Sequence, residues 1–86
     1  MKAILTKRLA PTNTKPARIK AYDSDGNNLV LSVHDAELYR VTDVEALHRV
    51  VAYQFAIKMD WLLRPGGGEY TLHGGGTKEG YAWVLV

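Results

Sequence analysis

The 86-residue sequence contains no cysteine. This absence excludes disulfides, thiolate nucleophiles and cysteine-ligated zinc or iron–sulfur centres. The sequence also lacks any apolar run approaching the roughly 20 residues of a membrane-spanning helix. The apolar stretch near its start is too short for a signal peptide. We therefore expect a cytoplasmic protein with no membrane partner.

Acidic residues are missing from the first 22 positions, where the first carboxylate to follow is Asp23. The same 22 positions carry six lysines and arginines and therefore sum to +6, whereas the rest of the chain sums to −4, which together give the net charge of +2. An asymmetry of this kind predicts one basic surface on an otherwise nearly neutral protein.

Motifs for catalysis or metal binding are also scarce. Neither of the two serines stands in a G-x-S-x-G context, and the three histidines are far apart without ligand spacing. Gly74–Lys78 resembles a phosphate-binding loop only superficially, because threonine precedes lysine and no helix pattern follows. We expect a protein that is not an enzyme, with no catalytic residue, no metal ion and no cofactor.

The length indicates a single α+β domain over residues 1–86, and the 47% apolar content is enough to form a core without covalent staples. Lys2–Leu9 is typical of a strand. Ala17–Tyr22 alternates between apolar and polar side chains, and Leu29–His34 does so again after the turn-forming Asp23–Asn28. The first half of the chain therefore predicts three strands, of which the last two form a hairpin.

One long helix is predicted after these strands. Thr42–Glu45 matches a capping box, in which Thr42 is the N-cap and Glu45 reaches back to it. Apolar residues then recur every three or four positions until Leu63, where Arg64 and the following Pro-Gly run end the helix. At about 20 residues the helix would be roughly 30 Å long, enough to cross a small sheet.

The C-terminal segment predicts a second hairpin. Glu69–His73 forms one strand, Gly74–Gly80 the turn, and Tyr81–Val86 a strand with apolar residues on both faces. Such a strand is typical of the middle of a sheet or of one covered on both sides. The complete prediction is a mainly antiparallel sheet in β-β-β-α-β-β order, with one long helix packed across one face.

The basic surface is predicted on the sheet face that the helix leaves open. If Ile19 packs against the helix, then Arg18, Lys20 and Tyr22 lie on that open face, and the first strand could add Thr6 and Arg8. Cations would neutralise phosphates, and a flat aromatic ring would stack on a base or pack on a sugar. The candidate nucleic-acid contact residues are Arg8, Thr12, Asn13, Thr14, Lys15, Arg18, Lys20 and Tyr22.

Two aspects of this hypothesis stay open. The first strand fits either phase, and a slip of one residue exchanges Arg8 for Lys7. An amphipathic hairpin must also show polar residues to water, and basic residues blunt sheet edges, without any nucleic acid. Whether DNA or RNA is bound is not decided by the sequence. The alternative function is a small module that binds or inhibits a host protein through its open sheet face or a strand edge; self-association is a third.

Several short motifs together resemble a family of small uncharacterised proteins found in phages, prophages and some proteobacterial genomes. The motifs are Lys2–Lys7, Pro11–Thr14, Ala17–Ala21, Asp23–Asn27, His48-Arg49, Lys58–Trp61 and Gly75–Tyr81. The resemblance implies a mobile-element context and no particular activity. Two positions depart from it, because the family pattern has glycine where Pro16 and Asp60 stand here.

Overall fold

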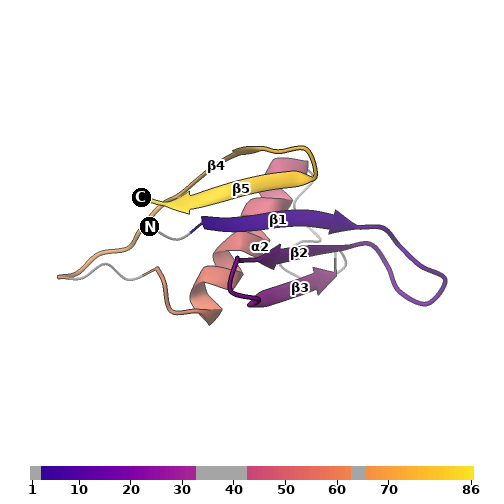
Figure 1. Ribbon diagram of the computed structural model, residues 1–86, viewed down its shortest axis with the longest axis horizontal. Coiled ribbons are helices and arrows are strands. Elements are labelled where there is room, and N and C mark those ends of the chain that lie inside the picture. The colour runs from indigo at the N-terminus through magenta and orange to yellow at the C-terminus, as the bar shows by residue number, and fades with distance from the viewer. Residues whose placement is uncertain (1–2, 33–42, 63–65) are drawn as a thin grey trace.

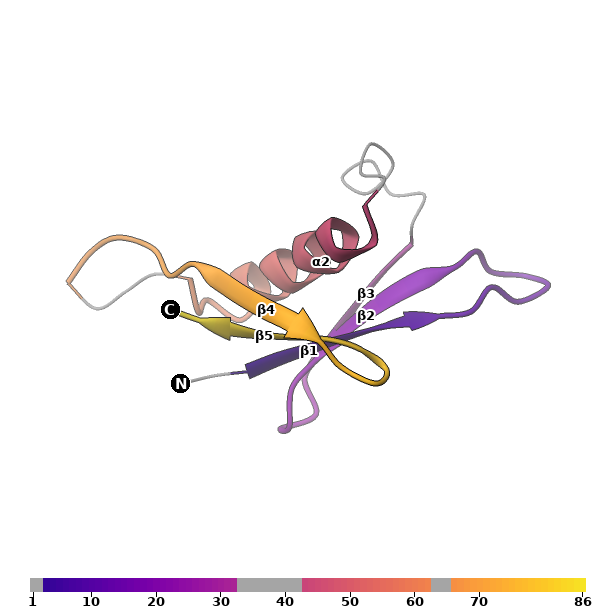
Figure 2. The same ribbon diagram turned by 90° about the horizontal axis from the view of Figure 1, so that it is seen from above.

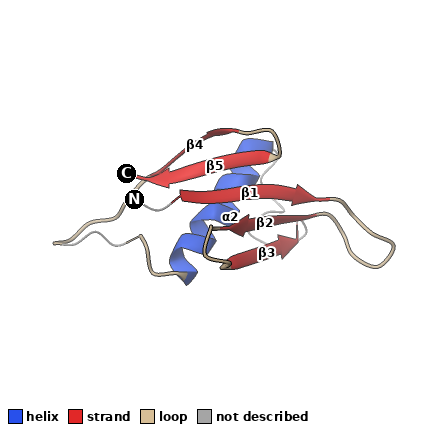
Figure 3. Ribbon diagram, in the orientation of Figure 1, coloured by secondary structure: helices blue, strands red, loops and turns tan. Residues whose placement is uncertain are grey.

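A five-stranded antiparallel sheet forms the centre of the computed structural model, which describes residues 3–32, 43–62 and 66–86 (Figure 1). Its strands stand in the order β3-β2-β1-β5-β4, and one helix, α2, lies across one face (Figure 3). The bounds are β1 Ala3–Leu9, β2 Arg18–Tyr22, β3 Asn28–Ser32, α2 Val44–Lys58, β4 Leu72–Gly76 and β5 Gly80–Leu85. The predicted α+β class and order of elements are confirmed.

The β2–β3 hairpin follows from the alternation in the sequence. Ile19 and Ala21 of β2 are buried, and they pair with Leu31 and Leu29 of β3. These four side chains therefore share the face that α2 covers. Residues 33 and 34, which were predicted to continue this strand, lie outside the described residues.

Asp23 organises the turn between β2 and β3. Its carboxylate accepts hydrogen bonds from the backbone N–H groups of Asp25 and Asn27, at 3.0 and 2.9 Å, and from the Asn27 side-chain amide at 3.0 Å. Gly26 supplies the positive φ of +90° that closes the turn. The predicted turn therefore forms through the hydrogen bonds of the Asp23 carboxylate and the left-handed conformation of Gly26.

Helix α2 begins one residue later than predicted. Asp43 is the N-cap, and its carboxylate accepts a hydrogen bond from the Ala46 backbone N–H at 3.1 Å. The prediction of Thr42 as the cap was wrong, because the acidic side chain next to it takes the orphan N–H group. Thr42 itself lies outside the described residues.

The helix also ends earlier than predicted, at Lys58 and not near Leu63. Asp60 adopts the left-handed conformation, with φ of 59°, and the Trp61 N–H donates to the Ala56 carbonyl at 2.9 Å. This geometry matches a Schellman helix end, whose left-handed position favours glycine.

The core lies between α2 and the sheet, and the uncovered face lies on the opposite side (Figure 2). The buried residues of α2 recur at helical spacing: His48, Val51, Ala52, Phe55 and Ala56. They pack against the inward-facing residues of the sheet, including Ile4, Ile19, Ala21, Trp83 and Leu85. Phe55 also meets Trp61 edge to face, with ring centroids 5.5 Å apart.

The β4–β5 hairpin differs from its prediction. Gly74, Gly75 and Gly76 belong to β4, and the turn is confined to Thr77–Glu79. The Thr77 N–H donates to the Gly80 carbonyl at 2.7 Å, and the Gly80 N–H donates to the Thr77 hydroxyl at 3.1 Å. The glycines were predicted as a turn, whereas their pairing with β5 makes them a strand beside the Trp83 ring.

Candidate functional site

The open face of β2 carries three of the predicted contact residues. Arg18, Lys20 and Tyr22 alternate with Ile19 and Ala21, which are buried on the helix side. The three side chains are half-buried along the surface of the strand. The structure therefore brings Arg18, Lys20 and Tyr22 onto one face, which α2 does not cover.

The structure shows which side chains of β1 face the helix, a point that the sequence left open. Ile4 and Thr6 are buried on the helix side, at 0% and 2% exposed, so that Leu5 and Lys7 face the open side. Arg8 has the phase of Thr6 and pairs with Ile19. The placement of Arg8 and Thr6 on the open face was wrong, because burying Ile4 fixes the phase of the whole strand.

Lys7 takes the place that was predicted for Arg8. It lies directly opposite Lys20 in the β1–β2 ladder, and both ammonium groups lie over the ring of Tyr22, at 5.5 and 5.6 Å from its centroid. Like charges that face each other across strands repel, and the negative face of the ring offsets part of that repulsion. The alternation around Ile4 is the signal that could have identified Lys7 from the sequence.

No carboxylate of the described residues forms an ion pair with Lys7, Arg18 or Lys20. The described strand residues that face the open side include no acid. The Nε atom of Arg18 is buried and has no hydrogen-bond partner there. A buried unpaired donor is costly for the folded protein. We call Lys7, Arg18, Lys20 and Tyr22 the basic cluster.

The predicted loop residues lie next to the Arg18 end of the basic cluster and apart from its Tyr22 end. Thr12, Asn13, Thr14 and Lys15 are exposed in the loop that extends beyond the ends of β1 and β2 (Figure 1). The loop is held by its own hydrogen bonds, in which the Thr12 N–H donates to the Lys15 carbonyl at 2.9 Å and the Lys15 N–H donates to the Thr12 hydroxyl at 3.1 Å. It adjoins the Arg18 end of β2, whereas Tyr22 lies about 13 Å away at the other end.

A groove borders Tyr22 on the open face, with a volume of about 270 Å³. Leu5 and Tyr22 line it from the sheet, and the β4–β5 turn lines it from the side. Its lining residues are Leu5, Thr6, Tyr22, Thr77, Lys78, Glu79 and Tyr81. Sequence reasoning missed this groove, because it depends on the β4–β5 turn standing beside β1.

A second polar cluster is buried on the helix side. Thr6 Oγ1 accepts a hydrogen bond from Trp83 Nε1 at 3.1 Å and lies 2.8 Å from His48 Nδ1. The Thr6 hydroxyl donates to the Tyr81 carbonyl at 3.4 Å, and the direction of its contact with His48 depends on the imidazole tautomer. Burial lowers the pKa of His48 below 6.5, and the Tyr81 ring lies 4.7 Å from the imidazole. This cluster joins α2 to β1 and β5.

Because burial lowers the pKa of His48, we expect the protein to be less stable in mild acid than at neutral pH. Below pH 6.5 the unfolded chain binds a proton at His48 that the folded chain resists, so the free energy of unfolding should fall as pH drops from 7 toward 5. Each tenfold difference in proton affinity is equivalent to about 1.4 kcal/mol. Urea denaturation at several pH values would measure the slope.

His48→Gln should flatten that slope, since glutamine does not titrate. His73, which is exposed on β4, provides the matched control, and His73→Gln should retain the wild-type slope. An unchanged slope in His48→Gln would show that other groups cause the pH dependence.

The described residues contain no group of three or more His, Asp or Glu side chains arranged to hold a metal ion. In the same ranges, no helix has the length and apolarity needed to cross a membrane. Comparison of the chain with protein-family models, curated proteins and solved structures finds no match.

Proposed function

We propose that the protein is a non-enzymatic nucleic-acid-binding protein that uses the open face of its sheet. The observation that carries the proposal is the basic cluster: Lys7 and Lys20 lie over the Tyr22 ring, Arg18 shares their sheet face, and none of these cations has a carboxylate partner among the described residues. Nucleic acids combine phosphates with flat bases, and this pairing of groups complements both.

Each residue of the cluster has a distinct role in this proposal. Lys7 and Lys20 supply mobile point charges for phosphates, whereas the Arg18 guanidinium can bind two phosphate oxygens at once. Tyr22 supplies an aromatic surface for a base or a sugar. The exposed loop from Thr12 to Lys15 extends the contact beyond the sheet, with neutral donors and one charge.

The biological setting is part of the same proposal. The resemblance to phage and prophage proteins supports a bacterial cytoplasm and a mobile-element context. Within that setting the protein would bind nucleic acid without catalysing a reaction on it.

Salt dependence tests the proposal directly. Affinity for labelled DNA and RNA should fall steeply between low and physiological salt, with a logarithmic slope of about −0.9 per neutralised phosphate on duplex DNA and about −0.7 on single strands. Three cations thus predict a slope of roughly −2 to −3. Fluorescence anisotropy at a series of salt concentrations gives the slope. Absence of binding below tens of micromolar at low salt would reject the proposal.

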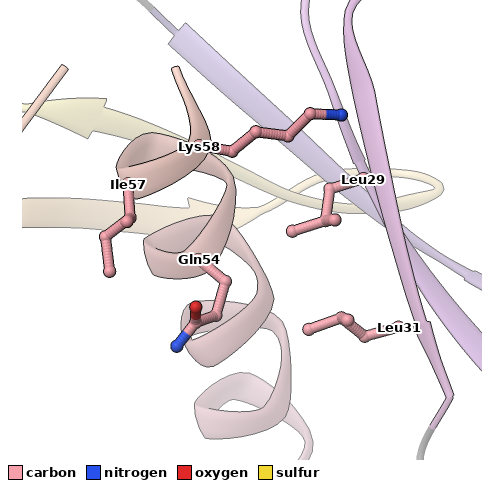
Figure 4. A pocket seen from close by; sticks show the side chains of 5 residues that line it. All are labelled: Leu29, Leu31, Gln54, Ile57 and Lys58. Carbon is pink, nitrogen blue, oxygen red and sulfur yellow. The ribbon is translucent and has the colours of Figure 1, made fainter. Parts of the chain in front are cut away.

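A second candidate function is protein binding at the β3 edge of the sheet. A groove of about 290 Å³ lies between β3 and α2 and is lined by Leu29, Leu31, Gln54, Ile57 and Lys58 (Figure 4). Ile57 is 50% exposed, and Lys58 Nζ donates to the carbonyl of Asn28 on β3 at 2.8 Å. β3 is one of the two edge strands of the described sheet, so an extended segment of a host protein could pair with it. Failure of the salt titration would favour this candidate.

A further inference from the structure

We infer that the preferred ligand is single-stranded nucleic acid, with one unstacked base held in the groove between Tyr22 and the β4–β5 turn. This inference rests on the proposed function and specifies its substrate class. It is carried by the groove and by its position beside the lysines of the basic cluster.

The groove has apolar, aromatic and charged lining residues, which suit a flat, partly apolar group. Leu5 pairs with Tyr22 on one side and with Ala82 on the other, so that a small residue lies next to Leu5 on the open face. Beyond Ala82 comes Gly75, which has no side chain. The β4–β5 turn stands on the side of the sheet away from α2 and supplies the second wall, through Thr77–Glu79 (Figure 2).

A duplex cannot use such a groove. Its base faces are stacked and hidden, and only base edges and the backbone reach a protein surface. A single strand can turn one base out of the stack and place it against an aromatic ring and an aliphatic side chain. Contacts with the groove should therefore raise the affinity for a single strand above that for a duplex.

The charges around the groove indicate on which side of it the phosphate backbone of the nucleic acid would lie. Lys7 and Lys20 lie over the Tyr22 ring, so a nucleotide whose base contacts Tyr22 brings its phosphate near both ammonium groups. Glu79 on the turn repels phosphate, although its neighbour Lys78 attracts it. The backbone should thus follow β2 from Tyr22 toward Arg18, along the side of the groove away from Glu79.

Three probes of equal length separate base contacts from charge contacts: labelled oligothymidylate, the duplex of that strand with its complement, and a strand made of abasic sites. At one salt concentration, oligothymidylate should bind about 10-fold or more tightly than either of the others. All three carry the phosphates, and only the first offers unstacked bases.

Tyr22→Leu removes the aromatic surface and keeps an apolar strand residue. It should weaken binding of oligothymidylate by about 10-fold and leave binding of the abasic strand unchanged. Tyr22→Phe should bind as the wild type does, which shows that the folded strand is intact. Tyr53→Leu is the matched control, because Tyr53 is exposed on α2.

The outcomes test the base site and the proposed function separately. If the three probes bind equally with a steep salt dependence, and Tyr22→Leu changes nothing, the base site is rejected and the proposed function stands. If none of the probes binds at low salt, both are rejected. Preference for oligothymidylate that Tyr22→Leu abolishes supports both.

Discussion

Replacing Gly74 or Gly80 with alanine is expected to lower the free energy of unfolding by about 2 kcal/mol or more, whereas the same change at Gly75 or Gly76 should be nearly neutral. A Cβ atom at Gly74 would overlap the ring of Trp83, and one at Gly80 would overlap the backbone carbonyl oxygen of Thr6. At Gly75 and Gly76 a Cβ atom meets nothing within 4 Å.

A Cβ atom cannot be accommodated at Gly74 and at Gly80 for different reasons. Trp83 is only 1% exposed and donates a hydrogen bond to Thr6, so its ring cannot move away from Gly74 without disturbing the core. At Gly80 the obstacle is the backbone of β1 itself, which is held by the central ladder of the sheet. Relieving either clash therefore requires a shift of β1, β4 or β5.

Urea denaturation of the four variants measures the difference, provided that the m-value stays constant. Alanine restricts the unfolded chain more than glycine does, so Gly75→Ala should be neutral or stabilising by up to about 1 kcal/mol. Equal stabilities of Gly74→Ala and Gly75→Ala would contradict the position of the Trp83 ring over β4.

The double variant Lys7→Glu with Lys20→Glu is expected to reduce nucleic-acid affinity by about 100-fold at low salt. It should also reduce the slope of log affinity against log salt concentration by about two. Both ammonium groups belong to the basic cluster, and the reversal replaces two phosphate contacts with two repulsions. Anisotropy titrations on the same oligonucleotides would measure both quantities.

The control for this variant has the same net charge. Arg8 neighbours Lys7 in the sequence but has the opposite strand phase, and Arg49 is exposed on α2. Arg8→Glu with Arg49→Glu should therefore cost far less affinity. Equal losses in the two double variants would show that overall charge, and not the open face, governs binding. Stability should change by about 0.5 kcal/mol or less at each exposed site.

The sequence predicts β2 well and β1 poorly, for a physical reason. In β2, polar and apolar residues alternate strictly, so only one phase buries Ile19 and Ala21. In β1, Ile4 and Leu5 are both apolar and Thr6 is compatible with either environment. The phase is decided by tertiary partners, namely the indole of Trp83 and the imidazole of His48, which lie far along the chain.

The basic cluster could be predicted only in part for the same reason. Arg18, Lys20 and Tyr22 follow from the alternation within β2, whereas Lys7 depends on the phase of β1. The groove beside Tyr22 depends on the position of the Thr77–Glu79 turn, which the sequence misplaced because the glycines of β4 were interpreted as part of that turn. Glycine propensity favours turns, but pairing with β5 and space for the Trp83 ring override it here.

The strand order has a consequence for how the chain reaches its native state. β1 is the middle strand of the sheet, and it pairs on one side with β5, so that Ile4 lies opposite Trp83. On a ribosome, β1, β2 and β3 emerge early. The edge of β1 that pairs with β5 stays unpaired until nearly all of the described chain has been synthesised. Contacts between such distant segments slow folding. During that interval the nascent chain exposes a strand edge on which another copy could pair, and chaperone demand should be highest then.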